Sequence, residues 1–208
     1  MAKDTLGAQR SRAVYDRLAS GYDYAMRPLE RWFLSRLRSR TLAALPEGSR
    51  ILEVGAGTGL NFPYYPRALA LGVASELSCE MIRIASGKQR RDRVHLVQTR
   101  AEMLPFADAS FDAAFATLVF CSVASPRQAF TELRRVVRPG GTIALLEHVR
   151  PGGLLLGPLF DALSVLTVAL FDDHFNRRTA DEARRAGLRT VRVERRFFGV
   201  IELIECRV

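Results

Sequence analysis

The sequence predicts an α/β fold in which helices cover both faces of a mostly parallel sheet. From Arg50 onward, short apolar runs alternate with helical patterns, the order of elements from which βαβ units are built. A glycine-rich loop follows the first apolar run directly, as expected where a strand turns into a helix. Near the end of the chain, two β-like runs flank Phe198-Gly199. So short a connection predicts an antiparallel pair at the sheet edge.

The expected elements follow one another closely along the chain. Strands are predicted over 50–54, 70–75, 94–98, 111–117 and 142–149, and helices between them over 59–66, 78–88 and 125–137. The segment "VRPGG", from Val137 to Gly141, ends the last of these helices, because it combines arginine, proline and two glycines. A further helix over 178–186 precedes the two closing strands, 189–196 and 199–207.

Helical material precedes the sheet. We expect residues 1–45 to form a helical N-terminal segment and residues 46–208 a single domain. The stretch "PLERWFLSRLRSRTLAAL" places Leu29, Trp32 and Leu37 on one apolar stripe with Phe33, and arginines surround the rest. Such a helix either docks its stripe on the domain or lies on an anionic membrane, where tryptophan and arginine are favoured.

The bulk composition is that of a globular protein, with 208 residues, 48% of them hydrophobic and 25% charged. The net charge of +9 favours anionic partners, whether phosphate-bearing small molecules, acidic lipids or nucleic acid, unless it reflects general arginine usage. The three cysteines are widely spaced and odd in number, which is typical of reduced thiols. The first residues lack the apolar region of a signal peptide, so we expect a cytoplasmic protein.

The stretch "ILEVGAGTG" indicates a ligand that lies against bare main chain. Glu53 ends the apolar run, and Gly55, Gly57 and Gly59 leave no side chain between backbone and ligand. No lysine follows as in a P-loop, and the spacing differs from the Gly-x-Gly-x-x-Gly of dinucleotide sites. Glu76 ends the second strand beside this loop, where a carboxylate can accept hydrogen bonds from both ribose hydroxyls. An adenosine-like ligand without a pyrophosphate fits best.

Four ordered motifs resemble those of the class I S-adenosylmethionine-dependent methyltransferases. They are "EVGAGTG", "SELSCEMIRIA", "RAEMLPFADASFDAAFATLVFCSV" and "ELRRVVRPGGTIALLEHV", and together they span most of the chain. The resemblance implies a Rossmann-like, seven-stranded, mostly parallel sheet of order 3-2-1-4-5-7-6. It also implies S-adenosyl-L-methionine as the cofactor and a reaction that needs no metal.

The resemblance assigns cofactor contacts to matching positions on the loop and the strand ends. These positions are Glu53, Gly55, Gly57, Gly59, Glu76, Leu77, Met81, Ala101, Glu102, Thr117 and Leu118. The glycine loop would pass under the methionine part, with Glu53 near its amino group. Glu76 would hold the ribose, and Thr117 with Leu118 would line the methionyl side.

At the adenine, Leu77 and Met81 would flank the ring, and Ala101 with Glu102 would line its edge. Relatives often have an aspartate where this chain has Arg100, and that carboxylate receives the adenine amino group. An arginine cannot accept a hydrogen bond, so Glu102 or a backbone carbonyl must take this one, or the adenine contact is weaker.

Methyl transfer requires an acceptor that is held in line and, where it is protonated, a base within reach. His148 ends the fifth strand at the ligand edge, and we expect it to be that base, to donate to the acceptor, or only to order the next loop. The segment "VYDRLASGYDYAM" resembles the opening of quinone and phospholipid methyltransferases, whose tyrosines close over the site. Tyr15 and Tyr22 are therefore lid candidates, the alternative being aromatic packing of an N-terminal helix.

Residues 150–177 are expected to form an apolar insertion on the acceptor side. Between Leu154 and Phe171 the only charge is Asp161, and the stretch reaches the lower length limit for a membrane span. A span there would separate strands that must pair. We therefore interpret it as an apolar lid or acceptor channel that can touch a bilayer.

These features favour an amphiphilic acceptor at an anionic membrane surface. Our leading expectation is a monomeric phosphatidylethanolamine N-methyltransferase, peripherally associated with the inner face of the membrane. The segments "TLVFCSV", "LLEHVRP" and "FDDHFNRRT" also look similar to membrane-associated thiol methyltransferases. Methylation of a small hydrophobic thiol or quinone is therefore the alternative, and a non-catalytic cofactor- or membrane-binding module is the alternative from another class. Nucleic acid is disfavoured, because no Asn/Asp-Pro-Pro-aromatic motif follows the fourth strand.

Overall fold

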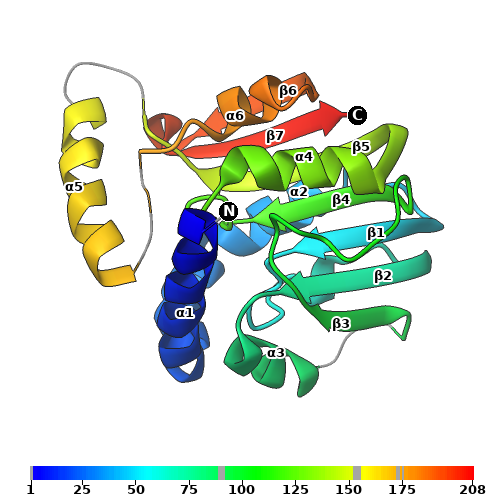
Figure 1. Ribbon diagram of the computed structural model, residues 1–208, viewed down its shortest axis with the longest axis horizontal. Helices are drawn as coiled ribbons and strands as arrows, with labels where there is room; N and C mark the ends of the chain where they lie inside the picture. The colour runs from blue at the N-terminus through cyan, green and yellow to red at the C-terminus, as the bar shows by residue number, and fades with distance from the viewer. Residues whose placement is uncertain (1, 89–91, 152–155, 172–173, 175) are drawn as a thin grey trace.

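The computed structural model describes residues 2–88, 92–151, 156–171, 174 and 176–208. Its seven strands form one sheet in the order β3-β2-β1-β4-β5-β7-β6, which confirms the expected topology (Figure 1). The first five strands pair in parallel, whereas β7 pairs antiparallel with β5 and β6. The strands are β1 (Ser49–Val54), β2 (Leu69–Glu76), β3 (Val94–Gln98), β4 (Phe111–Thr117), β5 (Val137–His148), β6 (Arg189–Arg196) and β7 (Ile201–Arg207).

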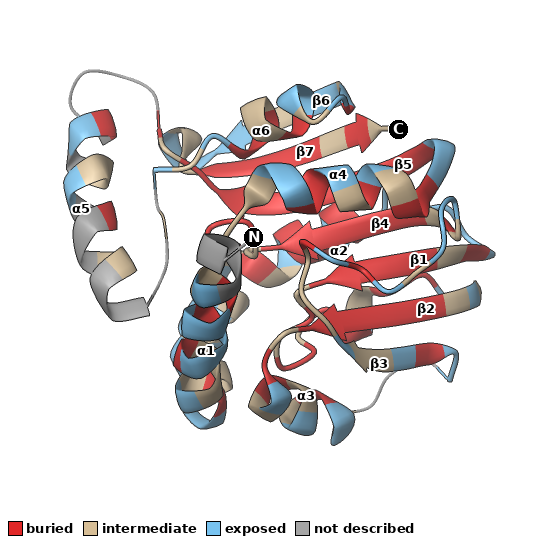
Figure 2. Ribbon diagram, viewed as in Figure 1, coloured by how far each residue is buried: buried red, intermediate tan, exposed pale blue. Residues whose placement is uncertain are grey.

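Helices cover both faces of the sheet, and Figure 2 shows the central strands buried between them. One core cluster packs α4 and α6 on one face, and a second packs α2, η2 and α3 on the other. Leu52 belongs to the first cluster and Ile51 to the second, because successive side chains of a strand point to opposite faces. The described helices are α1 (Ala2–Leu29), α2 (Ser35–Leu42), α3 (Cys79–Ser86), α4 (Pro126–Val136), α5 (Leu156–Phe171) and α6 (Thr179–Arg185), with the short turns η1 (Glu30–Leu34), η2 (Phe62–Tyr64) and η3 (Phe197–Gly199).

The helix predicted over 59–66 is wrong, because only the single 3₁₀ turn η2 forms there. Gly59 adopts a φ of +83°, and a Cβ atom at this position would lie 2.4 Å from the ring of Phe62. Tyr65 is extended, with ψ at 146°, as expected for a residue that precedes a proline. A left-handed glycine at one end and Pro66 at the other therefore leave room for one turn only.

The "VRPGG" segment only partly behaves as predicted. α4 ends at Val136, but β5 begins at once at Val137, so no separate turn intervenes. Gly140 has a φ of +75°, and its N–H donates to the Val208 carbonyl at 2.9 Å. The glycine thus lets the strand bend while it pairs with the end of the chain.

The N-terminal segment runs across the carboxyl ends of β1, β2 and β4 (Figure 1). Of the apolar stripe predicted for it, only part docks on the domain. Leu37 is buried, but Trp32 is 79% exposed, and Arg38, expected on the polar side, is only 3% exposed. The cause is η1, a five-residue π-helical turn that follows Pro28 and shifts the phase of every later residue.

The closing antiparallel hairpin is confirmed, with β6 at the sheet edge. Its turn is strained, because Phe197 and Phe198 both have left-handed φ values, of +49° and +57°. The ring of Phe197 lies 4.7 Å from that of Phe33, centroid to centroid, and Phe198 is 92% exposed. The turn therefore packs against the N-terminal segment.

Candidate active site

A cavity opens at the carboxyl edge of the sheet, between the ends of β1, β2 and β4 and the overlying α1. It holds about 870 Å³ of empty space, including its opening to solvent. All residues predicted for the site line it, except Glu53, Gly59 and His148. Those that line it are Tyr15, Tyr22, Gly55, Gly57, Glu76, Leu77, Met81, Ala101, Glu102, Thr117 and Leu118.

Two glycines of the loop after β1 differ in what surrounds them. Both have left-handed φ values, +69° at Gly55 and +55° at Gly57. A Cβ atom at Gly55 would lie 2.5 Å from Cγ2 of Val119, so the loop packs tightly there. A Cβ atom at Gly57 would meet no heavy atom within 4 Å and would take up cavity space. The bare main chain at Gly57 therefore fits a ligand such as S-adenosylmethionine lying directly against it.

Glu76 is held at the end of β2 by three backbone amides. Its Oε2 accepts from Gly57 N–H at 2.8 Å, and its Oε1 accepts from Leu77 and Ser78 N–H at 2.7 and 2.8 Å. Burial raises the pKa of Glu76, and these amides oppose the rise. A carboxylate offers about four acceptor positions, so Glu76 keeps one of them for a ribose hydroxyl.

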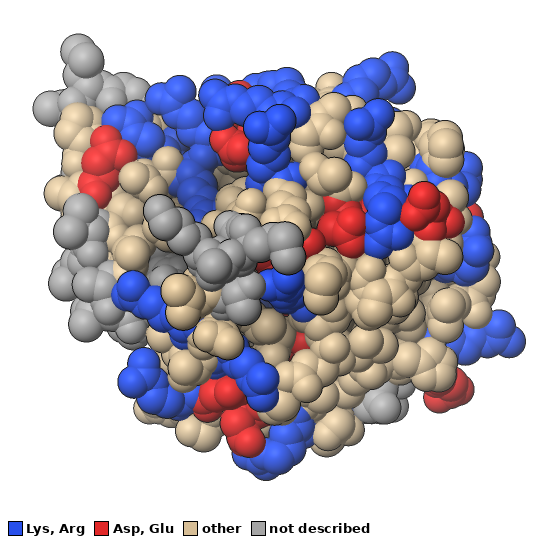
Figure 3. All heavy atoms as spheres, viewed as in Figure 1, with Lys and Arg blue, Asp and Glu red and all other residues tan. Residues whose placement is uncertain are grey.

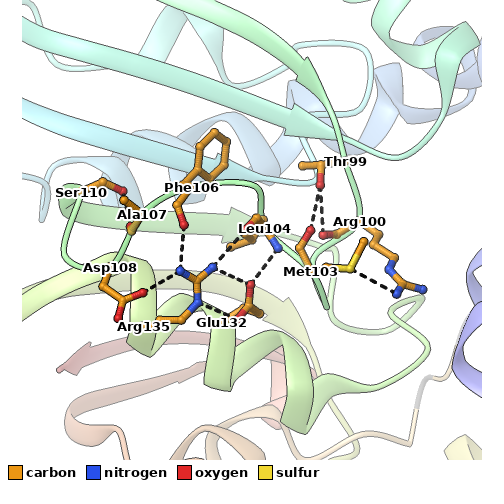
Figure 4. A network of polar contacts seen from close by, with 10 residues as sticks. All are labelled: Thr99, Arg100, Met103, Leu104, Phe106, Ala107, Asp108, Ser110, Glu132 and Arg135. Carbon is orange, nitrogen blue, oxygen red and sulfur yellow. Dashed lines mark hydrogen bonds and ion pairs between the residues drawn. The ribbon is translucent and has the colours of Figure 1, made fainter. Parts of the chain in front are cut away.

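Arg135 of α4 holds the loop between β3 and β4 in place (Figure 4). Its guanidinium donates to the carbonyls of Leu104 and Phe106 at 2.9 and 2.7 Å and pairs with Asp108 at 2.8 Å. It also pairs with Glu132, which accepts from Leu104 N–H at 2.8 Å. The hydrogen bonds with Glu132 raise the pKa of Arg135 above its usual value. The loop is thereby fixed against the helix.

Ala101 and Glu102, near the start of this loop, line the cavity, whereas Arg100 does not. The Nη2 atom of Arg100 lies 3.7 Å from Sδ of Met103, and Figure 4 shows the side chain pointing away from the sheet. Glu102 is buried, and its Oε1 accepts from Ser125 N–H at 3.2 Å. Glu102 is thus the carboxylate that lines the cavity at the start of the loop between β3 and β4.

The end of β4 carries a buried polar network. Thr117 Oγ1 accepts from Asn61 Nδ2 at 2.8 Å and from Arg38 Nη1 at 2.5 Å. Asn61 and Arg38 both line the cavity, and sequence reasoning missed both. Asn61 stands two residues after Gly59, and this closeness to the glycine loop could have indicated it. No local pattern could have found Arg38, because its orientation depends on the π-helical turn before it.

Glu53 lies beneath the cavity lining. It is fully buried, and its two carboxyl oxygens accept from Asn61 Nδ2 and from the Tyr65 hydroxyl, each at 2.6 Å. Burial raises the pKa of Glu53 to about 7, although both hydrogen bonds lower it. The predicted contact of Glu53 with the cofactor amino group stays a prediction. Asn61 lines the cavity at this point.

His148 also lies away from the lining. It is 8% exposed at the end of β5 and pairs with Ile201 of β7, so its role as a base stays a prediction. His95 is exposed on β3, and the backbone N–H of His174 donates to the Cys121 carbonyl. Within the part of the chain that the structure describes, no three His, Cys, Asp or Glu side chains are grouped so that they could hold a metal ion.

The two tyrosines of the N-terminal segment lie over the cavity. Tyr15 and Tyr22 are seven residues apart, close to two turns of α1, so both reach the same face of the helix. Burial raises the pKa of Tyr22 to about 12, so its hydroxyl is a hydrogen-bond donor at neutral pH.

The aspartates that follow these tyrosines tether α1 to the loops after β1 and β2. Asp16 Oδ1 accepts from the Ser78 hydroxyl at 2.5 Å, beside Glu76. Asp23 Oδ1 accepts from the Thr58 hydroxyl of the glycine loop, also at 2.5 Å. The repeated Tyr-Asp pair thus places each tyrosine over the cavity and each aspartate on its rim. We call residues 2–42, from α1 to α2, the cap.

The predicted acceptor-side insertion is described only in part, since residues 152–155, 172, 173 and 175 lie outside the described residues. Within it, α5 stands at the edge of the molecule (Figure 1). Asp161 pairs with Arg150, with oxygen to nitrogen distances of 2.9 and 2.8 Å, and Arg10 of the cap donates to the Val168 carbonyl at 2.8 Å. None of the described helices combines the length and apolar character needed to cross a membrane.

In sequence, this chain is similar to known methyltransferases. The methyltransferase domain family matches residues 52–145. A ubiquinone/menaquinone biosynthesis C-methyltransferase, UbiE, of Syntrophotalea carbinolica is 35% identical over 175 residues, which are 79% of this chain and 72% of that protein. The human thiol S-methyltransferase TMT1B is 38% identical over 103 residues, which are 48% of this chain and 42% of that protein.

Solved structures show the same fold. The crystal structure of an S-adenosylmethionine-dependent methyltransferase of Thermotoga maritima superposes with a TM-score of 0.71 at 21% identity, covering 95% of this chain and 99% of that chain.

Proposed function

This chain belongs to the class I S-adenosylmethionine-dependent methyltransferases, and on that premise we propose that it methylates the sulfur of a small hydrophobic thiol. When bound, S-adenosyl-L-methionine supplies a methyl group activated by its sulfonium charge, and the net reaction leaves S-adenosylhomocysteine, a methylated acceptor and a proton. The protein has to position the acceptor, exclude water and favour the acceptor's reactive form.

The observation that supports a thiol is the set of ionisable side chains lining the cavity. These are Tyr15, Tyr22, Arg38, Glu76 and Glu102. Both glutamates accept hydrogen bonds from backbone amides on the adenosine side, and Tyr22 stays protonated because its pKa is about 12. The described lining therefore holds no side chain suited to take a proton from a weakly acidic acceptor near neutral pH.

A thiol needs a general base less than an acceptor that ionises at higher pH. Its ordinary pKa is about 8.5, and the thiolate is the nucleophile, so a part of it is already reactive near neutral pH. The guanidinium of Arg38 and the hydroxyls of Tyr15 and Tyr22 favour an anionic acceptor over a neutral one. The remaining lining is small and largely apolar, and includes Ala8, Leu60, Val119, Val123 and Ala124.

A quinol is the second candidate acceptor, with methylation at a ring carbon. It is supported by the Syntrophotalea carbinolica relative, because the chain covers 72% of that C-methyltransferase. The leading sequence-based expectation, an amino head group of phosphatidylethanolamine, has no comparable support, since the relatives carry names of quinone and thiol methyltransferases.

We further propose that the enzyme collects its hydrophobic acceptor at an anionic membrane surface. Two neighbouring segments expose aromatic side chains: Trp32, 79% exposed on η1, and Phe198, 92% exposed on η3. The packed rings of Phe33 and Phe197 join these segments. Arginines flank both of them, and Figure 3 shows basic side chains gathered over α6 and β6. Exposed aromatics surrounded by arginine suit the interface of an acidic bilayer.

The test follows a tritiated methyl group from the cofactor into three acceptors: a hydrophobic aryl thiol, a demethylated naphthoquinol kept reduced, and phosphatidylethanolamine vesicles. We expect counts in the thioether product, rising with pH as the thiol ionises. Counts in the quinol alone would favour the second candidate, and counts in the lipid alone would contradict both. No counts in any acceptor, with S-adenosylhomocysteine binding intact, would contradict the proposed acceptor class.

Two variants accompany this assay. Glu76→Ala should abolish transfer to every acceptor, because it removes the cavity-lining carboxylate that we propose holds the ribose. Arg127→Ala is the matched control, because this exposed residue of α4 is not among the residues that line the cavity, and its activity should equal that of the wild type.

A further inference from the structure

A buried arginine of the cap reaches the cofactor cavity. Arg38 of α2 is 3% exposed and lines the cavity beside the end of β4. Its Nη1 donates to Asn61 Oδ1 at 2.8 Å and to Thr117 Oγ1 at 2.5 Å. Its Nε donates to Glu30 Oε1 at 3.0 Å, and its Nη2 lies 2.9 Å from the same oxygen. The guanidinium thus bridges the cap and the sheet.

The anionic surroundings of this cation are incomplete. Arginine keeps its charge in proteins, so burying it requires compensating anions. Glu30 contacts it through one oxygen only. Glu53, the other carboxylate of the network, bonds to Asn61 and Tyr65, and its pKa of about 7 leaves much of it neutral at neutral pH. A further anion in the cavity would complete the set.

The number of N–H donors on Arg38 also indicates that an anion can bind in the cavity. A guanidinium carries five N–H donors in one plane, a fork that matches a carboxylate. Among the described residues, Glu30, Asn61 and Thr117 account for four of these donors in Arg38. One donor on Nη2 is left for a ligand.

The strand order decides which part of the cofactor lies near Arg38. β2, β1 and β4 are adjacent in the sheet, and they carry Glu76, the glycine loop and Thr117 at their ends. A cofactor with its ribose on Glu76 and its chain along Gly57 extends toward Thr117. Its methionine part, which ends in a carboxylate, therefore points to the position where Arg38 donates to Thr117.

We propose that Arg38 binds the carboxylate of the cofactor's methionine part, which makes the N-terminal cap a component of the cofactor site. This inference rests on the methyltransferase family and its cofactor, and it is independent of which acceptor is methylated.

The test is a calorimetric binding cycle with two ligands, S-adenosylhomocysteine and its decarboxylated analogue, S-adenosyl-3-thiopropylamine. For the wild type, we expect loss of the carboxylate to weaken binding by about 10- to 100-fold, the range for a hydrogen bond to a charged group. In Arg38→Gln, S-adenosylhomocysteine should weaken by a similar factor while the analogue binds within about twofold of its wild-type affinity.

Each other result would overturn the proposal. Equal affinity of the wild type for both ligands rules out any recognition of the carboxylate, and this result needs no variant to fold. Equal loss of both ligands in Arg38→Gln would mean a general structural role, and no loss of either would mean no contact. Arg36→Gln, an exposed arginine two residues earlier on α2, is the matched control and should keep both affinities. Because no acceptor enters this assay, its failure is separate from that of the proposed reaction.

Discussion

Glu53 shows at the scale of a residue how burial changes the chemistry of the site. It is the penultimate residue of β1, has no exposed surface, and is hydrogen-bonded to Asn61 and Tyr65. Burial raises its pKa from 4.5 to about 7, so near neutral pH the carboxyl exchanges between its neutral and charged forms. The residue links the floor of the cavity, through Asn61, to Thr117 and Arg38. Its protonation therefore affects the stability of the whole network.

This shift predicts a pH dependence of folding stability. Between pH 4.5 and 7, the folded protein holds a proton on Glu53 that the unfolded chain has lost. The stabilising contribution is therefore complete below pH 4.5, falls as the pH rises to 7, and is absent above. Glu53→Gln should remove this fall and gain up to about 3 kcal/mol relative to the wild type between pH 4.5 and 8.

Urea unfolding of both proteins at pH 5 and pH 8 measures this difference. Glu80→Gln, on the exposed side of α3, serves as the control and should follow the wild type at both pH values. Parallel stability curves for the wild type and Glu53→Gln would show that Glu53 does not titrate as proposed.

At the scale of elements, α1 covers the cavity because two aspartates hold it there. Asp16 accepts from Ser78 at the N-terminus of α3, and Asp23 accepts from Thr58 in the glycine loop. These two bonds lie next to the glycine loop and the end of β2, the two segments that we propose contact the cofactor. Closure of the cap and binding of the cofactor are therefore expected to depend on each other.

Removing both tethers should open the cap. We expect the double variant Asp16→Ala, Asp23→Ala to be cut by trypsin within α1 about tenfold faster or more, because hydrogen bonds to two carboxylates are lost. The arginines of α1 supply the cleavage sites, and mass spectrometry of the fragments locates them. Asp92→Ala, at an exposed position before β3, is the control. An unchanged cleavage rate would mean that other contacts hold α1 in place.

The whole molecule combines a positive surface with two exposed aromatic segments. The net charge is +9, and the aromatic segments η1 and η3 meet through the rings of Phe33 and Phe197. The strained φ values of Phe197 and Phe198 hold the second segment outward from the sheet. Together these features support the proposal of binding to an anionic bilayer.

Vesicle flotation tests this proposal. We expect the protein to float with vesicles that contain phosphatidylglycerol, to float less as salt increases, and to stay unbound with phosphatidylcholine alone. Phe198→Asp should reduce binding, whereas Met103→Asp, an exposed apolar residue of the loop after β3, should not. Equal binding to neutral vesicles, or equal effects of the two variants, would contradict this orientation.

The sequence by itself determined the features that local patterns encode. The strand boundaries agree to within a few residues, except at β5, because apolar runs between turn residues mark them. The positions of Gly57 and Glu76 at the cavity could be predicted, since a bare turn after one strand and an acidic residue at the end of the next must meet at the same sheet edge. The sequence could not decide between a thiol, a quinol and a phospholipid acceptor, because the cavity is lined by segments that are distant in sequence.

The tertiary structure alone decided what is buried and against what. Arg38 and Trp32 belong to one basic amphipathic stretch, yet a π-helical turn buries the arginine at the cofactor cavity and leaves the tryptophan exposed. Glu53 lies near the end of its strand, as predicted, but Asn61 and Tyr65 hydrogen-bond its two oxygens. Sequence periodicity describes a few residues at a time, whereas burial and charge depend on long-range contacts, which form only when the chain has folded.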